Sequence, residues 1–156
     1  MSHIPNQIHQ TWNSALLPEQ GGTLHAAFHV ATDGMLLEAR NAERVALAVT
    51  VSRGSLVVEA PEDHIVLDVE DTYGVQFGGV HDLHITFGDF GTRIYLDGYQ
   101  AFACATNICP SKYAQAGVFH CANEAHIGVE RLECFSEAWT SERIQGSVPV
   151  PQPDIE

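Results

Sequence analysis

Basic residues are scarce in this sequence. Seven Lys and Arg stand against twenty Asp and Glu, so the formal net charge is −13. A surface this negative repels the phosphate backbone of nucleic acids and the head groups of anionic membranes. We therefore expect neither a nucleic acid nor a membrane as partner, and the charge alone indicates only a soluble surface.

Long apolar runs are also missing. No segment approaches the ~20 apolar residues that span a bilayer. The first ten residues lack the basic and apolar regions of a signal peptide. Two alternatives for the location follow, and the sequence leaves both open: the chain is cytosolic, or it was excised from a longer parent protein that is secreted.

Several motifs that carry chemistry are absent. The sequence has no Gly-rich turn between a strand and a helix and no Gly-x-Ser-x-Gly elbow. Glycoside hydrolysis needs two carboxyl groups ~5–9.5 Å apart across the substrate. The nearest acidic pair at strand spacing, Asp68 and Glu70, stands at a strand end. We therefore predict no catalytic residues, and a small stand-alone hydrolase remains a minor hypothesis.

Cysteine and histidine show no recognisable metal-binding pattern. Four cysteines are present without the paired CxxC spacing of zinc sites: Cys104, Cys109, Cys121 and Cys134. Their spacing fits buried thiols and also one or two disulfides. His25 and His29 share a face of one expected strand but lie about 13 Å apart, too far to share one ion. We predict no metal site from these residues.

Short alternating segments separated by turn residues fill most of the chain. Residues 24–30 and 45–51 alternate between apolar and small or polar side chains, which is typical of half-buried strands. Arg53-Gly54 and Asp97-Gly98 are suited to tight turns. Thr140 is placed to cap a single helical turn. The pattern predicts about ten to twelve short strands and no long helix, which indicates an all-β antiparallel sandwich or barrel.

The same pattern gives the domain organisation. We expect an irregular N-terminal segment at residues 1–20, one β-sandwich domain at residues 21–145, and a proline-containing tail or linker at residues 146–156. A chain of 156 residues is long enough to form one hydrophobic core without help from metals or disulfides.

The stretch from His81 to Tyr99 resembles the central hairpin of concanavalin A-like and laminin-G-like domains. Residues 81–87 read HDLHITF and residues 91–98 read GTRIYLDG, which match a strand ending in hxhxF and a return strand ending in YxDG. The segments 22–59 and 127–144 look like the opening and closing strands of the same fold. The resemblance covers residues 21–145 and implies a two-sheet antiparallel jelly roll. It is closest to accessory sugar-binding modules of bacterial glycoside hydrolases, of the β-fructosidase (fructanase) and sialidase types.

The resemblance implies a non-catalytic carbohydrate-binding module that belongs to, or accompanies, a glycoside hydrolase. Arg93, Tyr95 and Asp97 alternate with the inward-facing Ile94 and Leu96, so they project from the face where such sandwiches bind ligands. The fork of an Arg guanidinium suits a carboxylate or two neighbouring hydroxyls.

Glu59 and Tyr99 complete the expected carbohydrate site. Glu59 ends a strand where sialidase-type modules carry an acidic residue followed by a basic one, whereas Ala60-Pro61 follows here. This departure favours neutral sugars and the β-fructosidase type over the sialidase type. We expect no cofactor, with calcium as the alternative. Related sandwiches bind calcium through loop carboxylates, and the candidates here are Glu62-Asp63 and Glu70-Asp71.

A structural β-sandwich is the competing hypothesis. Such a domain packs on a neighbouring catalytic domain or mediates oligomerisation without binding sugar. A large exposed apolar patch would favour it.

Overall fold

The computed structural model of the chain contains two antiparallel β-sheets. It describes residues 10–42, 44–68 and 79–148. Sheet A has six strands in the order β1 (Gln10–Asn13), β10 (Ala116–Cys121), β3 (Gly34–Arg40), β4 (Val45–Ser52), β5 (Ser55–Ala60) and β6 (Asp63–Asp68). Sheet B has five strands in the order β11 (Ile127–Phe135), β2 (Gly21–Val30), β7 (Val80–Gly88), β8 (Gly91–Leu96) and β9 (Tyr99–Cys104). The described helices are α2 (Pro110–Tyr113) and α3 (Ser141–Ser147).

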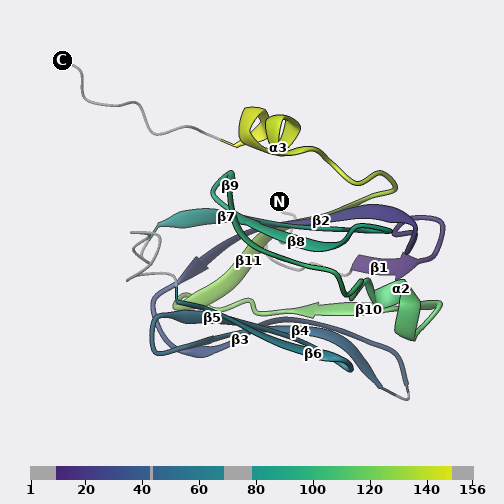
Figure 1. Ribbon diagram of the computed structural model, residues 1–156. Coiled ribbons are helices and arrows are strands. Elements are labelled where there is room, and N and C mark those ends of the chain that lie inside the picture. Colours follow the sequence, from purple (N-terminus) through teal and green to yellow (C-terminus); the bar gives the residue numbers. More distant parts are fainter. Residues whose placement is uncertain (1–9, 43, 69–78, 149–156) are drawn as a thin grey trace, which may run out of the picture.

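The two sheets lie face to face as layers, with α3 on the outer side of sheet B (Figure 1). No described helix covers the outer face of sheet A (Figure 1). This arrangement confirms the predicted all-β, two-sheet antiparallel sandwich. The two outer faces therefore differ: one is covered by α3, and the other is open.

Alternating apolar residues fill the space between the sheets. On β7 the inward side chains are Leu83, Ile85 and Phe87, and on β8 they are Ile94 and Leu96; all five belong to one buried cluster. The register places Leu83 opposite Leu96 and Ile85 opposite Ile94. Burying one such side chain contributes about 1.5–3 kcal/mol. The hairpin identified in the sequence is thus central to the core, and it fixes which side chains point outward.

The segment before the first predicted strand also contributes to the sandwich. Residues 10–13, which we expected to be irregular, form β1 and pair with β10. Trp12 is buried, contacts Phe119 with 5.2 Å between ring centroids, and donates a hydrogen bond from Nε1 to the Ala114 carbonyl. The indole lies over Gly117, where an added Cβ would come within 2.2 Å of the ring. A glycine is therefore needed opposite this tryptophan.

Two local predictions are confirmed. Asp97 and Gly98 have φ angles of 50° and 90° and join β8 to β9 in a tight turn. Thr140 is the N-cap of α3, and its side chain accepts a hydrogen bond from the Arg143 amide. Both positions follow from residue type, because Asp-Gly tolerates positive φ and a threonine hydroxyl satisfies a free helix amide.

The four cysteines are free thiols. Of the two alternatives that the sequence left open, the structure therefore has thiols and no disulfides. Burial raises the pKa of the Cys109 thiol to about 11 and those of Cys121 and Cys134 to about 12. These three side chains are protonated near neutral pH and are poor nucleophiles.

None of the described helices is long and apolar enough to cross a membrane.

Candidate functional site

Four side chains from four neighbouring strands form one row across the outer face of sheet B. Glu133 of β11 stands opposite His25 of β2, and His25 stands opposite His84 of β7. His84 in turn stands opposite Tyr95 of β8. These residues alternate with the inward-facing core residues, so all four project outward. We call them the outer-face row.

His25 is held between two carboxylates. Its Nε2 lies 2.7 Å from Asp82 Oδ1 and its Nδ1 lies 3.0 Å from Glu133 Oε1. An ionised carboxylate only accepts hydrogen bonds, so both ring nitrogens of His25 must carry hydrogen. Burial lowers the pKa of His25, but the hydrogen bonds to Asp82 and Glu133 outweigh it, and the pKa lies above the ordinary 6.5. The same hydrogen bond from His25 lowers the pKa of Asp82.

His84 stacks on His25 and stays neutral. The two rings are nearly parallel, 10° apart in orientation, with 4.2 Å between centroids. Burial, together with the charge on His25, lowers the pKa of His84 to about 4. The side chain has no exposed surface, and neither ring nitrogen has a hydrogen-bond partner. A buried neutral imidazole with an unused donor and an unused acceptor is uncommon in a folded protein.

Residues 136–148, which we call the C-terminal strap, cover His84 and Tyr95 of the outer-face row, whereas the Glu133 side chain at its other end is 42% exposed. The Thr23 hydroxyl donates to the Glu137 carbonyl at 2.7 Å and accepts from the Trp139 amide at 2.9 Å. The hydroxyls of Tyr95 and Ser141 are 2.9 Å apart, within hydrogen-bond distance. Ile144 of α3 is buried. These contacts hold α3 against the sheet, as its position in Figure 1 shows.

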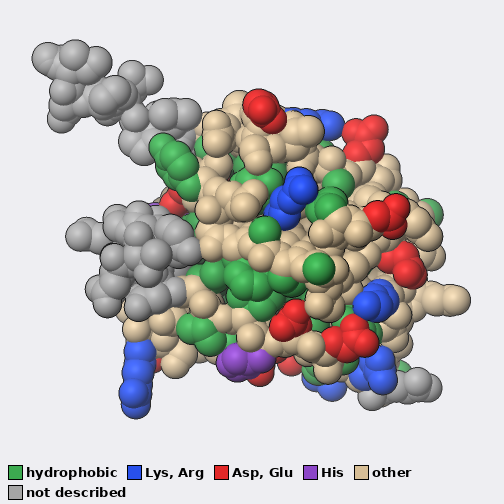
Figure 2. Space-filling model, viewed as in Figure 1, with side chains coloured by type: hydrophobic (Ala, Val, Ile, Leu, Met, Phe, Trp, Pro, Cys, Tyr) green, Lys and Arg blue, Asp and Glu red, His purple; other side chains and the backbone are tan. Residues whose placement is uncertain are grey.

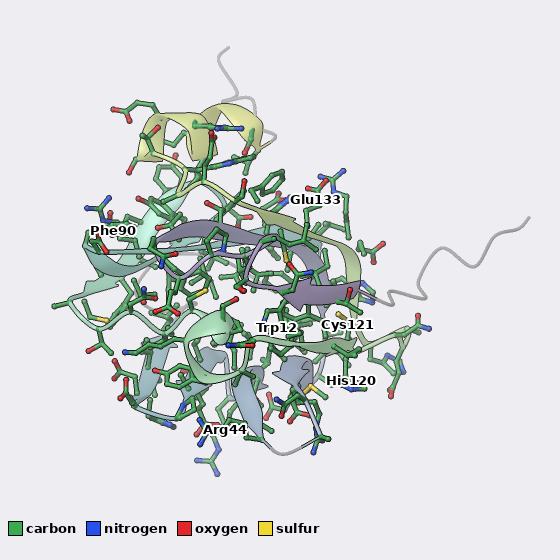
Figure 3. The ribbon with its side chains drawn as sticks, turned by 90° about the vertical axis from the view of Figure 1, so that its right-hand side faces the viewer. Trp12, Arg44, Phe90, His120, Cys121 and Glu133 are labelled. Atoms are coloured by element: carbon green, nitrogen blue, oxygen red, sulfur yellow. The ribbon has the colours of Figure 1, made fainter. Side chains whose placement is uncertain are left out.

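Aromatic rings and guanidinium groups pair at two places on this face. In the strap, the Arg143 guanidinium lies 4.1 Å from the centre of the Trp139 ring, and Trp139 packs on Phe135 at 4.4 Å. At the β7–β8 turn, the Arg93 guanidinium lies 4.2 Å from the centre of the Phe90 ring. Figure 3 shows Phe90 and Glu133 on opposite sides of the molecule below α3.

The structure places the predicted residues of β8 in different environments. Arg93 and Tyr95 project from the face opposite Ile94 and Leu96, as the alternation predicts. Arg93 is half-buried, and it is absent from the ion pairs that arginine and lysine form among the described residues. Tyr95 has no exposed surface, because α3 covers it.

Asp97, Tyr99 and Glu59 do not join Arg93 in one cluster. The Asp97 carboxylate accepts from the Asp82 amide at 2.9 Å and lies 2.8 Å from His81 Nδ1, so internal contacts engage it. Tyr99 is 70% exposed at the start of β9. Glu59 projects from sheet A, where it pairs with His64 at 2.9 Å. The predicted site is therefore divided between the two sheets.

The carboxylates considered for calcium are partly accounted for. Glu62 accepts hydrogen bonds from Lys112 and Tyr113, both at 3.0 Å, and these lower its pKa. Glu70-Asp71 lies outside the described residues, as does Glu70 of the acidic pair considered for hydrolysis. Within residues 10–42, 44–68 and 79–148, no group of three His, Cys, Asp or Glu is arranged to hold a metal ion.

Three residues of this face were not identified from the sequence as a group: His25, His84 and Thr86. The strand pattern places His25 outward on one strand and His84 outward on another. Nothing in the sequence indicates that these two strands pair with the two histidines in register. The signal that the sequence does contain is an outward-facing polar residue on each of two expected strands, which makes both histidines candidates for a site on one face of the sheet.

Known proteins resemble this chain in structure only. Its sequence matches no protein-family model and no curated protein. Trypanosoma rangeli sialidase in complex with 2,3-difluorosialic acid superposes with a TM-score of 0.60 at 13% identity, over 92% of this chain and 28% of the sialidase. NanB with Optactamide gives 0.64 at 11% identity, over 92% of this chain and 27% of NanB.

A toxin has the same sandwich. A structure of botulinum neurotoxin type C, whose cell entry depends on interaction with two ganglioside molecules, superposes with a TM-score of 0.56 at 7% identity. The match covers 85% of this chain and 36% of the toxin chain. The chain thus spans about a quarter to a third of these proteins. At such low identity, the likeness shows that they share a β-sandwich fold.

Proposed function

We propose that the chain is a carbohydrate-binding domain and that it binds sugar on the outer face of sheet B. The observation that carries the proposal is the pairing of guanidinium groups with aromatic rings on that face, Arg93 with Phe90 and Arg143 with Trp139. Sugars offer an apolar ring face and a rim of hydroxyls. A site that recognises both needs aromatic surface beside planar hydrogen-bond donors.

Arg93 is the main candidate for direct contact with the sugar. Its guanidinium carries five donors in a fixed fork, and no described carboxylate neutralises it. Stacking on Phe90 limits the orientations that the group can adopt, so less entropy is lost when a ligand binds. Arg143 is already paired with Glu137 at 3.1 Å, and it therefore has fewer donors to offer.

The proposal extends to the parent protein and to the type of sugar. We assign the domain to the concanavalin A-like and laminin-G-like sandwiches and expect it to accompany a glycoside hydrolase without carrying catalytic residues. Among the proteins that share its fold, a sialidase is in complex with 2,3-difluorosialic acid, and the cell entry of a neurotoxin depends on interaction with two ganglioside molecules. Because the carboxylates of Asp82 and Glu133 lie on the same face of sheet B, we favour neutral sugars of the β-fructosidase type over acidic ones.

A glycan array of the purified domain tests the proposal, with fructans, other neutral glycans and sialosides present. We expect a specific hit that Arg93→Ala weakens by about tenfold or more. Arg40→Ala is the matched control, because Arg40 lies on sheet A, where it pairs with Glu38 at 3.2 Å. An array that stays blank with folded protein, or a hit that Arg93→Ala leaves unchanged, would contradict the proposal.

One observation favours the competing structural role. On the open face of sheet A the register aligns Met35, Thr50, Val57 and Val66 in one row. Met35 is 41% exposed and Val66 is 56% exposed. A blank array would make this apolar row the candidate surface for packing on a neighbouring domain.

A further inference from the structure

We infer that the layer between β7 and the C-terminal strap is a subsite for a hydroxyl group of a neutral sugar, formed by His84, Thr86 and Trp139. The inference rests on the proposed function, which it makes more specific. It assigns a role to buried polar groups that the aromatic and guanidinium pairs do not use.

Four buried polar atoms in this layer have no partner. They are His84 Nδ1, His84 Nε2, Thr86 Oγ1 and Trp139 Nε1. A buried donor or acceptor left unpaired destabilises a protein. They are also the only such side-chain atoms within the described part of the chain. Because all four unpaired atoms lie in this one layer, a function of the layer itself has to account for them.

The three side chains lie close together on the outer face of sheet B. His84 and Thr86 are two residues apart on β7, so both project from the outer face of sheet B. The Trp139 and His84 ring centroids are 5.8 Å apart. Thr86 stands opposite Thr23, whose hydroxyl bonds the backbone of Glu137 and Trp139. The strap thus places the indole beside His84 and its own backbone beside Thr23, the cross-strand neighbour of Thr86.

The donors and acceptors suit an uncharged hydroxyl. The indole N–H only donates, the threonine hydroxyl donates and accepts, and a neutral imidazole offers one donor and one acceptor. A sugar hydroxyl both donates and accepts, so it can satisfy groups of each kind. A carboxylate fits poorly, because His84 has a pKa of about 4 and is neutral near pH 7, and because the carboxylates of Asp82 and Glu133 bind the neighbouring His25 ring.

The site adjoins the residue proposed to bind sugar directly. Thr86 stands opposite Arg93 in the pairing of β7 with β8, so the two outward side chains are cross-strand neighbours. A sugar that contacts Arg93 therefore lies next to the strand position of Thr86, and its hydroxyl reaches Thr86 only if the Trp139 side chain moves aside. Trp139 is only partly buried, which leaves its outer edge accessible.

The test compares Thr86→Val with Thr50→Val. Valine has the shape of threonine without the hydroxyl, and Thr50 is a half-buried strand residue on the opposite sheet. The probes for calorimetry are a short inulin-type fructan, lactose and cellobiose as neutral sugars, and sialyllactose as an acidic one. The second readout is the melting temperature of the sugar-free protein.

We expect Thr86→Val to raise the melting temperature by about 2–4 °C, because it removes an unpaired buried hydroxyl. The same change should weaken binding of the neutral sugar by about tenfold. His84→Phe should act in the same direction in both readouts, and Thr50→Val should alter neither. A gain in stability with a loss of affinity distinguishes a binding group from a structural one.

Other outcomes overturn the inference. If Thr86→Val lowers the melting temperature, the hydroxyl already has a partner such as a bound water and the site is structural. If the wild type binds a neutral sugar and Thr86→Val binds it equally well, the inference fails and the proposed function stands. If only sialyllactose binds the wild type, the inference fails and a carbohydrate-binding function stands. If no probe and no glycan of the array binds the wild type, both fail.

Discussion

His25 and His84 show how the same residue type acquires opposite properties from its neighbours. Both rings lie on the outer face of sheet B and stack at 4.2 Å. His25 lies between two carboxylates and is stabilised as a cation, with a raised pKa. His84 has no carboxylate in hydrogen-bond distance and is kept neutral by burial and by the neighbouring charge.

The pH dependence of stability follows from these two residues. His84 has a lowered pKa in the folded state, so the unfolded chain takes up its proton first as the pH falls from 6.5 to about 4. Its contribution is present above pH 6.5 and is lost across that window, by about 3 kcal/mol in the free energy of unfolding. His25 has a raised pKa, so its contribution is present below 6.5 and is lost as the pH rises through its folded value.

The resulting prediction is a stability maximum near pH 6.5. Urea unfolding between pH 4 and pH 8 measures it. His84→Phe should remove most of the decline on the acid side, because phenylalanine keeps a flat ring on His25 and binds no proton. A decline of the same size in His84→Phe would show that other groups cause it.

At the scale of single residues, the sequence predicts which face of a sheet a side chain points to better than it predicts which residues that side chain contacts. The alternation around Ile94 and Leu96 correctly places Arg93 and Tyr95 on the outward face. It says nothing of the strap that covers Tyr95, because Tyr95 and Ser141 meet only when β8 and α3 are packed together. The stacking of His25 on His84 is hidden for the same reason, since it depends on the register of strands distant in the chain.

Two glycines, one in a strand and one in a helix, differ in the space around them. Gly117 lies under the Trp12 ring, so a Cβ there would overlap the indole and separate β1 from β10. Gly146 is within α3, and nothing lies within 4 Å of an added Cβ. Alanine in a helix is favoured over glycine by about 0.5–1 kcal/mol.

We therefore predict opposite effects for the same substitution. Gly117→Ala should lower the free energy of unfolding by about 2 kcal/mol or more, and Gly146→Ala should raise it by about 0.5–1 kcal/mol. Chemical denaturation followed by tryptophan fluorescence measures both. If Gly117→Ala were neutral, β1 would not be packed on β10 as described.

Turns and helix caps are the most predictable elements of the fold. The turn at Asp97-Gly98 and the cap at Thr140 follow from local residue chemistry, and both are confirmed. Strand β1 was not expected, because four residues with one tryptophan give too short a pattern to identify. Its partner β10 is distant in the sequence, since Gln10 pairs with Phe119, and only tertiary packing can specify such a pairing.

At the scale of the molecule, the two outer faces present different surfaces. The face of sheet B carries aromatic rings, guanidinium groups and a buried polar layer under the strap. The face of sheet A carries an apolar row beside the Glu59–His64 pair. In the view of Figure 2, acidic and basic side chains are scattered over the surface and do not gather into one charged patch. That side therefore has no large patch of a single charge that would attract a ligand. The two outer faces differ instead in the side chains that a ligand would contact.

The most direct test of the central claim is an NMR titration of the isotope-labelled domain with the neutral sugar that binds best. The account predicts that amide signals of Thr86 and Arg93 and the indole N–H signal of Trp139 shift together and saturate. Signals of the sheet A face around Glu59 and Val66 should stay in place. Shifts confined to the sheet A face, or no shifts at all, would contradict the claim that sugar binds on the outer face of sheet B.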